Sequence, residues 1–275
     1  MIGYFFQQLP LWVIALLFLA VLSVAVELGF RVGLRKRKQW PDAEIGGGGV
    51  VLTAMMALLG LILAFTYSAS ASRYDARKQA VIVEANDIGT AFLRAGLVDD
   101  PGRTELRQAL AQYARTRIVG GGRGMSQGET EAIIQRTLQA QARLWPITEA
   151  IVQRSARGPI EASLVAAVNE VIDQHTIRIA GLMDKLPGAV LCMLMLIACG
   201  SMAVTGFNAG VSGCISRWRL SMFSLVLSGV LFVIIDLDRP REGFVRVSLA
   251  SLVELVEEMD AMLARGGGAT PARPD

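Results

Sequence analysis

The sequence predicts an all-α integral membrane protein with four transmembrane helices and an extramembrane helical bundle between the second and third of them. The first observation is the distribution of charge: 19% of the 275 residues are charged, yet four long stretches carry no charge. The second is their length, because a membrane-spanning helix needs about 20 largely apolar residues. The third is the helical spacing of apolar residues in the charged remainder, where no convincing strand-like alternation is found.

Residues 1–72 are predicted to form a first transmembrane hairpin, with spans at about 9–30 and 49–71. Charge is absent from Met1 to Val26 and again from Ile45 to Ser72. A cleaved signal peptide is the alternative for the first span. Such peptides open with basic residues, whereas here the basic run RVGLRKRK follows the span. We therefore expect the first span to be retained as an anchor.

The second span is expected to continue into water as one unbroken helix. No Pro interrupts Leu61–Asn86, and no Gly follows Gly60 until Gly89. Small residues recur along the span at steps of three and four, which allows close packing of membrane helices and also fits a narrow pathway lined by this helix. An apolar constriction in such a pathway can gate by dewetting. The pore-lining candidates are the small residues Thr53, Ala57, Gly60, Ala64 and Ser68 and the larger neck residues Leu58, Leu61, Ile62 and Phe65.

Residues 73–186 are predicted to form the extramembrane helical bundle. The stretch ELRQALAQYARTRI repeats apolar residues at helical spacing. Ser126 with Glu129 is typical of a capping box that begins a second helix. Pro146 is expected to kink or end that helix. A third helix, with Pro159 near its first turn, runs toward the third span.

Residues 187–237 are predicted to form the second hairpin, with spans at about 187–208 and 218–237. Trp218 at the start of the last span fits a membrane interface. Residues 238–264 are expected to form a C-terminal amphipathic helix, and residues 265–275 a disordered tail. The acidic residues expected on the solvated face of that helix are Glu254, Glu257, Glu258 and Asp260.

Little in the sequence points to catalysis or to a cofactor. A net charge of +3, without a basic stripe interleaved with aromatics, argues against nucleic-acid binding. The one histidine, His175, cannot build a zinc site by itself and is expected on a helix surface. Cys192, Cys199 and Cys214 are interpreted as small apolar packing residues. We therefore predict a protein that is not an enzyme and that holds no metal or cofactor.

The orientation in the membrane depends on a balance of basic residues. The two short loops contain Arg31, the run RKRK and, in the second loop, Arg217 and Arg219, which places them in the cytoplasm by the positive-inside rule. The opposite side is flanked by Arg73, Arg77, Lys78, Arg239, Arg241 and Arg246. The sequence leaves both orientations open.

Two motif blocks carry a family resemblance. They are LAFTYSASASRYDARKQAVIVEANDIGTAFLRAGL and IIDLDRPREGFVRVSLASLVEL. The residues involved are Phe65, Arg73, Tyr74, Arg77, Glu84, Ala85, Asn86, Ile88, Gly89, Thr90 and Arg94 in the first block and Asp236, Asp238, Arg239, Pro240 and Arg246 in the second. Together with the four-span layout, they resemble the bestrophin-like family of bacterial membrane proteins, which are relatives of the bestrophin anion channels.

The resemblance implies a homo-oligomer, with five subunits as in bestrophins, in the bacterial inner membrane. Its axial pore would be lined by the second span and would pass small ions, with anions favoured. Bestrophins carry an acidic calcium-binding run after the last span, whereas the acidic residues here are spread along the C-terminal helix. The lipid bilayer, other copies of the chain and small ions are thus the implied partners.

Charged and amide residues near one membrane face form a second set of candidates. Arg73 and Arg77 lie one turn apart where the second helix leaves the lipid, and the fourth span ends at the same face with Asp236 and Asp238, followed by Arg239. We expect ion pairs there, the alternative being an arginine that faces the pore and attracts anions. Glu84 and Asn86 lie where the helix enters the bundle, and Asn86 is expected to hydrogen bond between helices.

Two functions therefore remain open. The first is an oligomeric channel, motivated by the continuous second helix, its small face and the resemblance. The second is a non-conducting membrane sensor or scaffold whose helical bundle binds a partner, motivated by the size of the bundle. Transporters are disfavoured because neither a broken helix nor an inverted repeat is visible.

Overall fold

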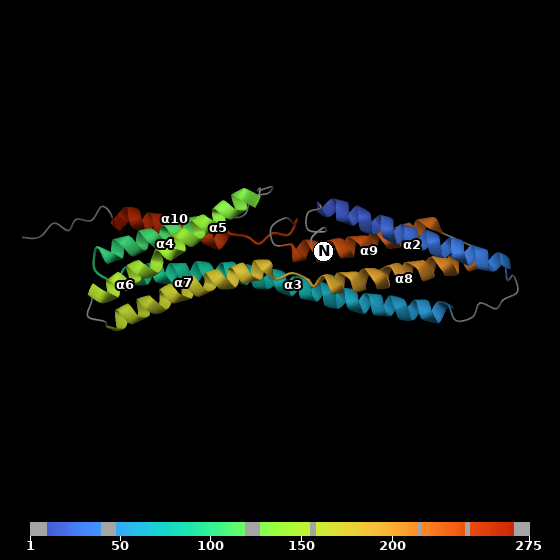
Figure 1. Ribbon diagram of the computed structural model, residues 1–275, viewed down its shortest axis with the longest axis horizontal. Coiled ribbons are helices and arrows are strands. Elements are labelled where there is room, and N and C mark those ends of the chain that lie inside the picture. The colour runs from blue at the N-terminus through green and yellow to red at the C-terminus, as the bar shows by residue number, and fades with distance from the viewer. Residues whose placement is uncertain are drawn as a thin grey trace, which may run out of the picture. The chain divides into compact units, whose positions relative to one another are not determined.

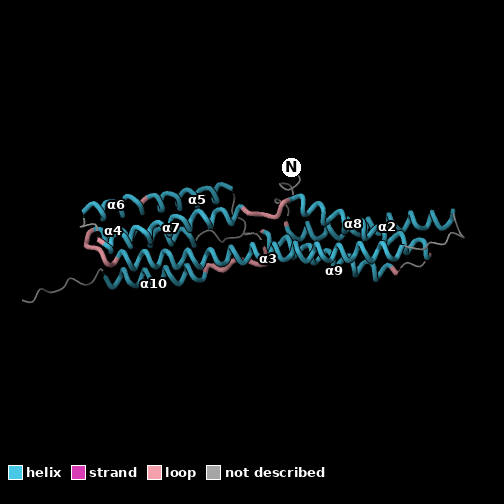
Figure 2. Tube along the Cα trace, turned by 90° about the horizontal axis from the view of Figure 1, so that it is seen from below, coloured by secondary structure: helices cyan, strands magenta, loops and turns pink. Residues whose placement is uncertain are grey.

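The computed structural model describes residues 10–39, 48–118, 127–154, 158–213, 216–239 and 243–266. Every regular element in these ranges is an α-helix (Figure 2), which confirms the predicted all-α class. The expectations for Ser126, Cys214, Pro240, Arg241 and residues 267–275 fall outside the described residues.

The chain divides into two compact units. The spanning unit consists of Met1–Tyr74, Lys185–Arg239 and Gly243–Val245. The bundle unit consists of Asp75–Asp184, Pro240–Glu242 and Arg246–Asp275. Helix α3 (Gly48–Ala95) contributes to both units without a break, so the prediction of one helix that continues past the apolar stretch is confirmed.

The spanning unit is built from α2 (Leu11–Gln39), the first part of α3, α8 (Gly188–Ser212) and α9 (Arg217–Asp238) (Figure 1). Within the described residues, four helices are long and apolar enough to cross a membrane. Helix α2 is longer than its predicted span, because the basic run assigned to the first loop continues the helix to Gln39. Arg and Lys favour helices, and cations are stabilising near a helix C-terminus.

Glycines allow α2 and α8 to approach at backbone contact. A Cβ added at Gly29 would collide with the carbonyl oxygen of Ala203, and additions at Gly33, Gly206 and Gly210 would collide with carbonyl oxygens in the same way. Each helix thus carries two glycines four residues apart, which is the small-residue spacing typical of closely packed membrane helices. Around this contact the unit buries an apolar core that includes Leu22, Leu194 and Met202.

Among its described residues, the bundle unit combines the last part of α3 with five further helices (Figure 1). These are α4 (Gly102–Ile118), α5 (Gln127–Ala142), α6 (Leu144–Arg154), α7 (Pro159–Met183) and α10 (Ala250–Gly266). Their core contains Ile88, Phe92 and Tyr113 among other fully buried residues. It is continuous from α3 through α4 and α7 to α10, so one face of the last part of α3 is buried by contacts within the chain.

The two prolines behave as their positions predict. The helix before Pro146 ends at Ala142, and Pro146 lies in the first turn of α6, where its missing N–H costs nothing. Pro159 is the first residue of α7. Helix α10 begins at Ala250, later than position 238 in the sequence-based division, and its four acidic residues are exposed as expected.

Candidate functional site

The part of α3 that belongs to the spanning unit has an exposed face. Of the pore-lining candidates, Thr53, Ala57, Leu58, Gly60, Leu61, Ala64, Phe65 and Ser68 are exposed and Ile62 is half-buried. The large neck residues Leu58, Leu61 and Phe65 are 45%, 52% and 67% exposed. A Cβ added at Gly60 would meet no atom within 4 Å.

The exposed residues form two adjoining strips along α3. At 100° per residue, Leu58, Leu61 and Phe65 lie within about 60° of one another. The small residues Ala57 and Ala64, with Gly60 and Ser68, occupy the neighbouring arc. A bulky apolar strip beside a small one is suited to lining a narrow path while allowing another helix to approach closely.

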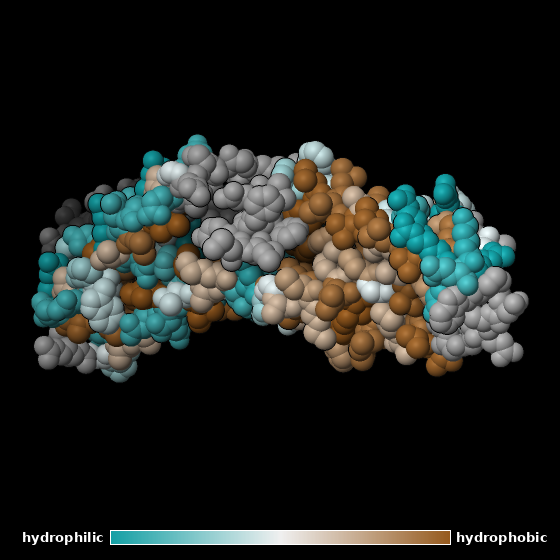
Figure 3. Space-filling view, turned by 45° about the vertical axis from the view of Figure 1, so that its right-hand side comes forward, coloured by the Kyte–Doolittle hydropathy of each residue, from teal (hydrophilic) through white to brown (hydrophobic). Residues whose placement is uncertain are grey.

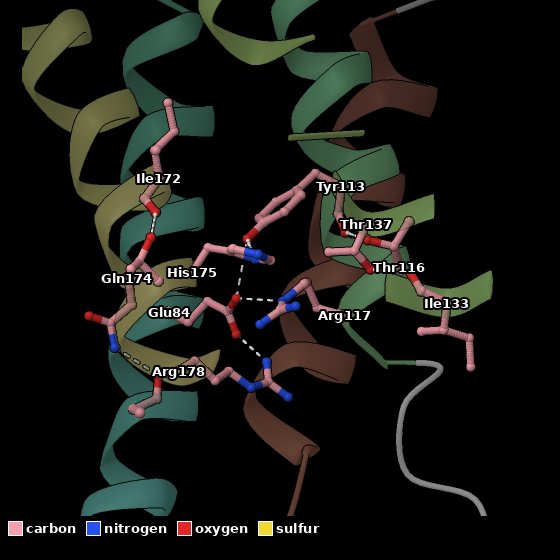
Figure 4. A network of polar contacts seen from close by, with 12 residues as sticks. Glu84, Tyr113, Thr116, Arg117, Ile133, Thr137, Ile172, Gln174, His175 and Arg178 are labelled. Carbon is pink, nitrogen blue, oxygen red and sulfur yellow. Dashed lines mark hydrogen bonds and ion pairs between the residues drawn. The ribbon is translucent and has the colours of Figure 1, made fainter. Parts of the chain in front are cut away.

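A buried polar junction joins three helices of the bundle unit around Glu84 (Figure 4). The Glu84 side chain on α3 is fully buried, and each of its oxygens accepts a hydrogen bond from a guanidinium group. Arg117 on α4 donates through Nε to Oε1 at 2.6 Å, and Arg178 on α7 donates to Oε2. One carboxylate therefore ties α3, α4 and α7 together through charge-assisted hydrogen bonds.

Tyr113 and His175 complete this junction, which we call the Glu84 junction. The Tyr113 hydroxyl donates to Glu84 Oε1 at 3.3 Å and lies 3.2 Å from His175 Nδ1. Because a hydroxyl has one proton, that geometry makes His175 Nδ1 the donor to Tyr113. Both side chains are buried, so the prediction of a surface histidine is wrong. His175 continues the buried stripe of α7 one turn after Val171.

Burial determines the protonation states in the Glu84 junction. It raises the pKa of Tyr113 well above its usual range, so the phenol stays protonated. Burial, reinforced by the positive charge of Arg117, lowers the pKa of His175 to about 4, so the imidazole is neutral at pH 7. The junction then holds two guanidinium charges and one carboxylate. Both carboxylate oxygens are engaged by arginines, so the group is arranged to fix helices rather than to coordinate a cation.

The two acidic residues at the end of α9 bind backbone amides. Asp236 is buried and accepts hydrogen bonds from the amides of Phe244 at 2.8 Å and Val245 at 3.0 Å. Asp238 accepts from the amide of Leu186, with both carboxylate oxygens 3.0 Å from that nitrogen. Asp238 therefore holds the segment just before α8 against the end of α9. Asp236 holds the segment that follows α9 against the same helix end.

A family model for the Bestrophin-like domain matches residues 14–252. The chain belongs to the Bestrophin-like family. No functionally curated protein matches the sequence significantly.

Solved structures agree with this assignment at the level of fold. A crystallised mutant of a bacterial Bestrophin homologue from Klebsiella pneumoniae is similar over 88% of this chain and 98% of its own, with a TM-score of 0.64 and 10% identity. A second mutant of that homologue covers 92% and 99%, with a TM-score of 0.61 and 12% identity. A crystal structure described as a membrane protein also covers 92% and 99%, with a TM-score of 0.62 and 12% identity. At these identities the likeness shows the fold alone.

The Bestrophin-like family is of channel type rather than enzymatic, and the four apolar helices make this member a multi-pass membrane protein. Several residues that carried the resemblance have contacts within the chain. Glu84 anchors the junction, and Arg94 donates to the carbonyl oxygen of Ser163 at 2.9 Å. Two residues of the first motif block, Glu84 and Arg94, thus contact other helices of the bundle unit.

The remaining candidates lie on α3 and at the end of α9. Arg73 donates to the carbonyl oxygen of Ala69 at 3.3 Å, and Arg77 is buried in the bundle unit near Gly181. Asn86 is exposed and lies outside the Glu84 junction. A hydrogen bond from Asn86 to another helix stays a prediction. Arg239 forms the C-cap of α9. Ion pairing of Arg73 and Arg77 with the α9 carboxylates stays a prediction.

Proposed function

We propose that copies of this chain assemble around an axis, as a pentamer in the bacterial inner membrane, and form an ion channel lined by α3. Leu58, Leu61 and Phe65 form the apolar constriction. The adjoining small strip of Ala57, Gly60, Ala64 and Ser68 lets neighbouring α3 helices approach closely, with Thr53 and Ile62 extending the lining.

The exposed face of α3 carries this proposal. Within one chain, α3 is the least covered of the four apolar helices: 11% of its most apolar stretch is buried, against 28–39% for the others. Oligomerisation through α3 would cover this face, and membership of the Bestrophin-like family supports ion conduction. Anions are the proposed permeant ions because the sequence resembles relatives of anion channels.

The proposal is tested by recording from the purified chain in planar bilayers. We expect unitary currents whose reversal potential follows a chloride gradient. Phe65→Ala is expected to change the unitary conductance, because it removes the most exposed side chain of the constriction. Phe223→Ala is the matched control, since Phe223 is an exposed phenylalanine on α9, and its current should equal that of the wild type.

Two outcomes would overturn the channel. Silence over a wide range of salts and voltages would favour the scaffold, in which the bundle unit binds a partner and no ion passes. If Phe65→Ala and Phe223→Ala changed the unitary conductance equally, α3 would not line the pore. Particle averaging of the purified complex gives an independent check, because a symmetric ring with α3 outermost contradicts the assignment.

A further inference from the structure

One end of the spanning unit carries six basic side chains that form no ion pair with another described residue. The C-terminal end of α2 exposes Arg35, Lys36, Arg37 and Lys38. Helix α9 begins with exposed Arg217 and Arg219. Among the described residues, the ion pairs of the spanning unit include Arg31 with Glu27, one turn below, but none of these six residues. We call these six residues the basic end.

Contacts between helices place both basic segments at the same end. Lys36 Nζ lies 5.6 Å from the ring centroid of Phe207 near the end of α8, and Arg37 lies against Gly213, the residue that caps α8. Helix α9 begins four residues later, at Arg217. Asp42 and Glu44 follow α2 in the sequence, outside the described residues. Even if both neutralised a neighbour, the basic end would keep an excess of four positive charges.

The basic end adjoins an exposed apolar surface. Leu28 and Val32 of α2 are 58% and 53% exposed and share a helix face with Arg35, one turn further on. Trp218, between the two arginines of α9, is 73% exposed, and tryptophan is enriched at the level of lipid headgroups. Figure 3 shows hydrophilic side chains gathered beside the apolar belt at this end of the spanning unit.

We propose that the basic end is a binding site for the phosphate groups of anionic phospholipids, with the acyl chains lying along Leu28 and Val32. A free soluble anion would use the charges but not the apolar stripe below them. Clusters of four to eight basic residues beside a membrane helix are attracted to anionic headgroups. Arginine additionally matches phosphate with a fork of donors. This site is independent of ion conduction.

The test measures which lipids the full chain retains. The protein is reconstituted in a mixture of phosphatidylglycerol and phosphatidylcholine, extracted mildly, and its bound lipids are quantified by mass spectrometry. The lipids bound to the wild type should contain a larger fraction of phosphatidylglycerol than the mixture does. The combined variant carries Arg35→Gln, Lys38→Gln, Arg217→Gln and Arg219→Gln, and it spares Lys36 and Arg37, which lie against Phe207 and Gly213. It should bind phosphatidylglycerol about tenfold less tightly or worse.

A charge-matched control separates a local site from overall charge. Arg136→Gln, Arg143→Gln, Arg154→Gln and Arg265→Gln remove four exposed charges from the bundle unit and should leave the enrichment intact. Equal loss in both variants, or no loss in either, would overturn the site. Inorganic phosphate at the concentration of the lipid should not displace phosphatidylglycerol, and displacement would assign the site to a soluble anion instead.

Two further measurements apply if the glutamine variant does not fold. Arg35→Lys, Arg217→Lys and Arg219→Lys keep the charge and should retain enrichment. In the wild type, enrichment should fall as ionic strength rises, because salt screens exposed charges. Enrichment that is insensitive to salt would contradict an electrostatic headgroup site.

Discussion

The two halves of helix α3 are built for different surroundings. In the bundle unit its side chains Val81, Glu84, Ala85, Ile88, Ala91 and Phe92 are buried. In the spanning unit most of the helix is exposed, including nearly all the pore-lining candidates. One half is therefore fixed by contacts within its own chain. The other half has an exposed face that can contact lipid or, in the proposed channel, further copies of the chain.

Two phenylalanines on α3 give the sharpest test of this difference. Phe92 in the bundle half is 1% exposed, and Phe65 in the spanning half is 67% exposed. Phe92→Ala should lower the free energy of unfolding by about 3–5 kcal/mol, because it leaves a cavity in a packed core. Phe65→Ala should change it by less than about 0.5 kcal/mol in dissociated chains. Chemical denaturation in detergent measures both, and equal losses would contradict the division of α3.

The bundle half is further fixed by the Glu84 junction. Glu84→Gln leaves Arg117 and Arg178 without their buried carboxylate, so we expect a loss of about 3 kcal/mol or more in the free energy of unfolding. Asp260→Asn removes an exposed ion pair with Arg115, and it should cost no more than about 1 kcal/mol. Denaturant titrations of the two variants compare them directly. Similar small losses would show that the junction does not fix α3.

Glycines extend the comparison within the spanning unit. Gly206 faces a backbone carbonyl of α2, whereas Gly60 on α3 faces open space. Gly206→Leu should lower the free energy of unfolding by about 1–3 kcal/mol through overpacking. Gly60→Leu should leave the stability of the single chain unchanged but weaken assembly, because close approach of α3 helices needs a small residue. Thermal unfolding and native mass spectrometry check the two effects, and intact assembly of Gly60→Leu would place another surface at the subunit contact.

Sequence periodicity and charge explain how much of this could be predicted. Charge-free length predicts the four spans, and the absence of Pro after Gly60 predicts the continuity of α3. The Glu84 junction is different, because its arginines lie 33 and 94 positions away and pairing at such distances leaves no local pattern. His175 did leave a signal: it follows Val168 and Val171 on the buried stripe of α7, but its polarity suggested a surface position.

The sequence also contains a pattern that could have predicted the glycine contacts between α2 and α8. Gly29 and Gly33, like Gly206 and Gly210, are spaced by four residues, as closely packed membrane helices require. The small face of α3 has the same kind of spacing, yet it is exposed within the chain. Spacing identifies a surface that can be approached closely. Whether the approaching helix comes from the same chain or from another copy depends on the tertiary and quaternary structure. A local sequence pattern does not determine these.

The smallest expected effect concerns the pH dependence of the bundle half. The folded pKa of His175 is about 4, below the usual value near 6.5. Above pH 6.5 the imidazole is neutral in both states, and its contribution to stability is complete. As pH falls from 6.5 to about 5, the unfolded chain binds a proton that the folded chain does not, so the free energy of unfolding decreases, by about 1–2 kcal/mol.

This decrease can be assigned to one residue because His175 is the only histidine of the chain. His175→Gln should flatten the dependence of unfolding free energy on pH between 7 and 5, where the carboxylates of Asp and Glu are still largely ionised. The folded state resists protonation of His175 chiefly because the imidazole is buried, and also because a third positive charge would stand beside Arg117 and Arg178 with Glu84 alone to balance them. An unchanged slope in His175→Gln would mean that another group titrates, and that His175 is not held neutral by the junction.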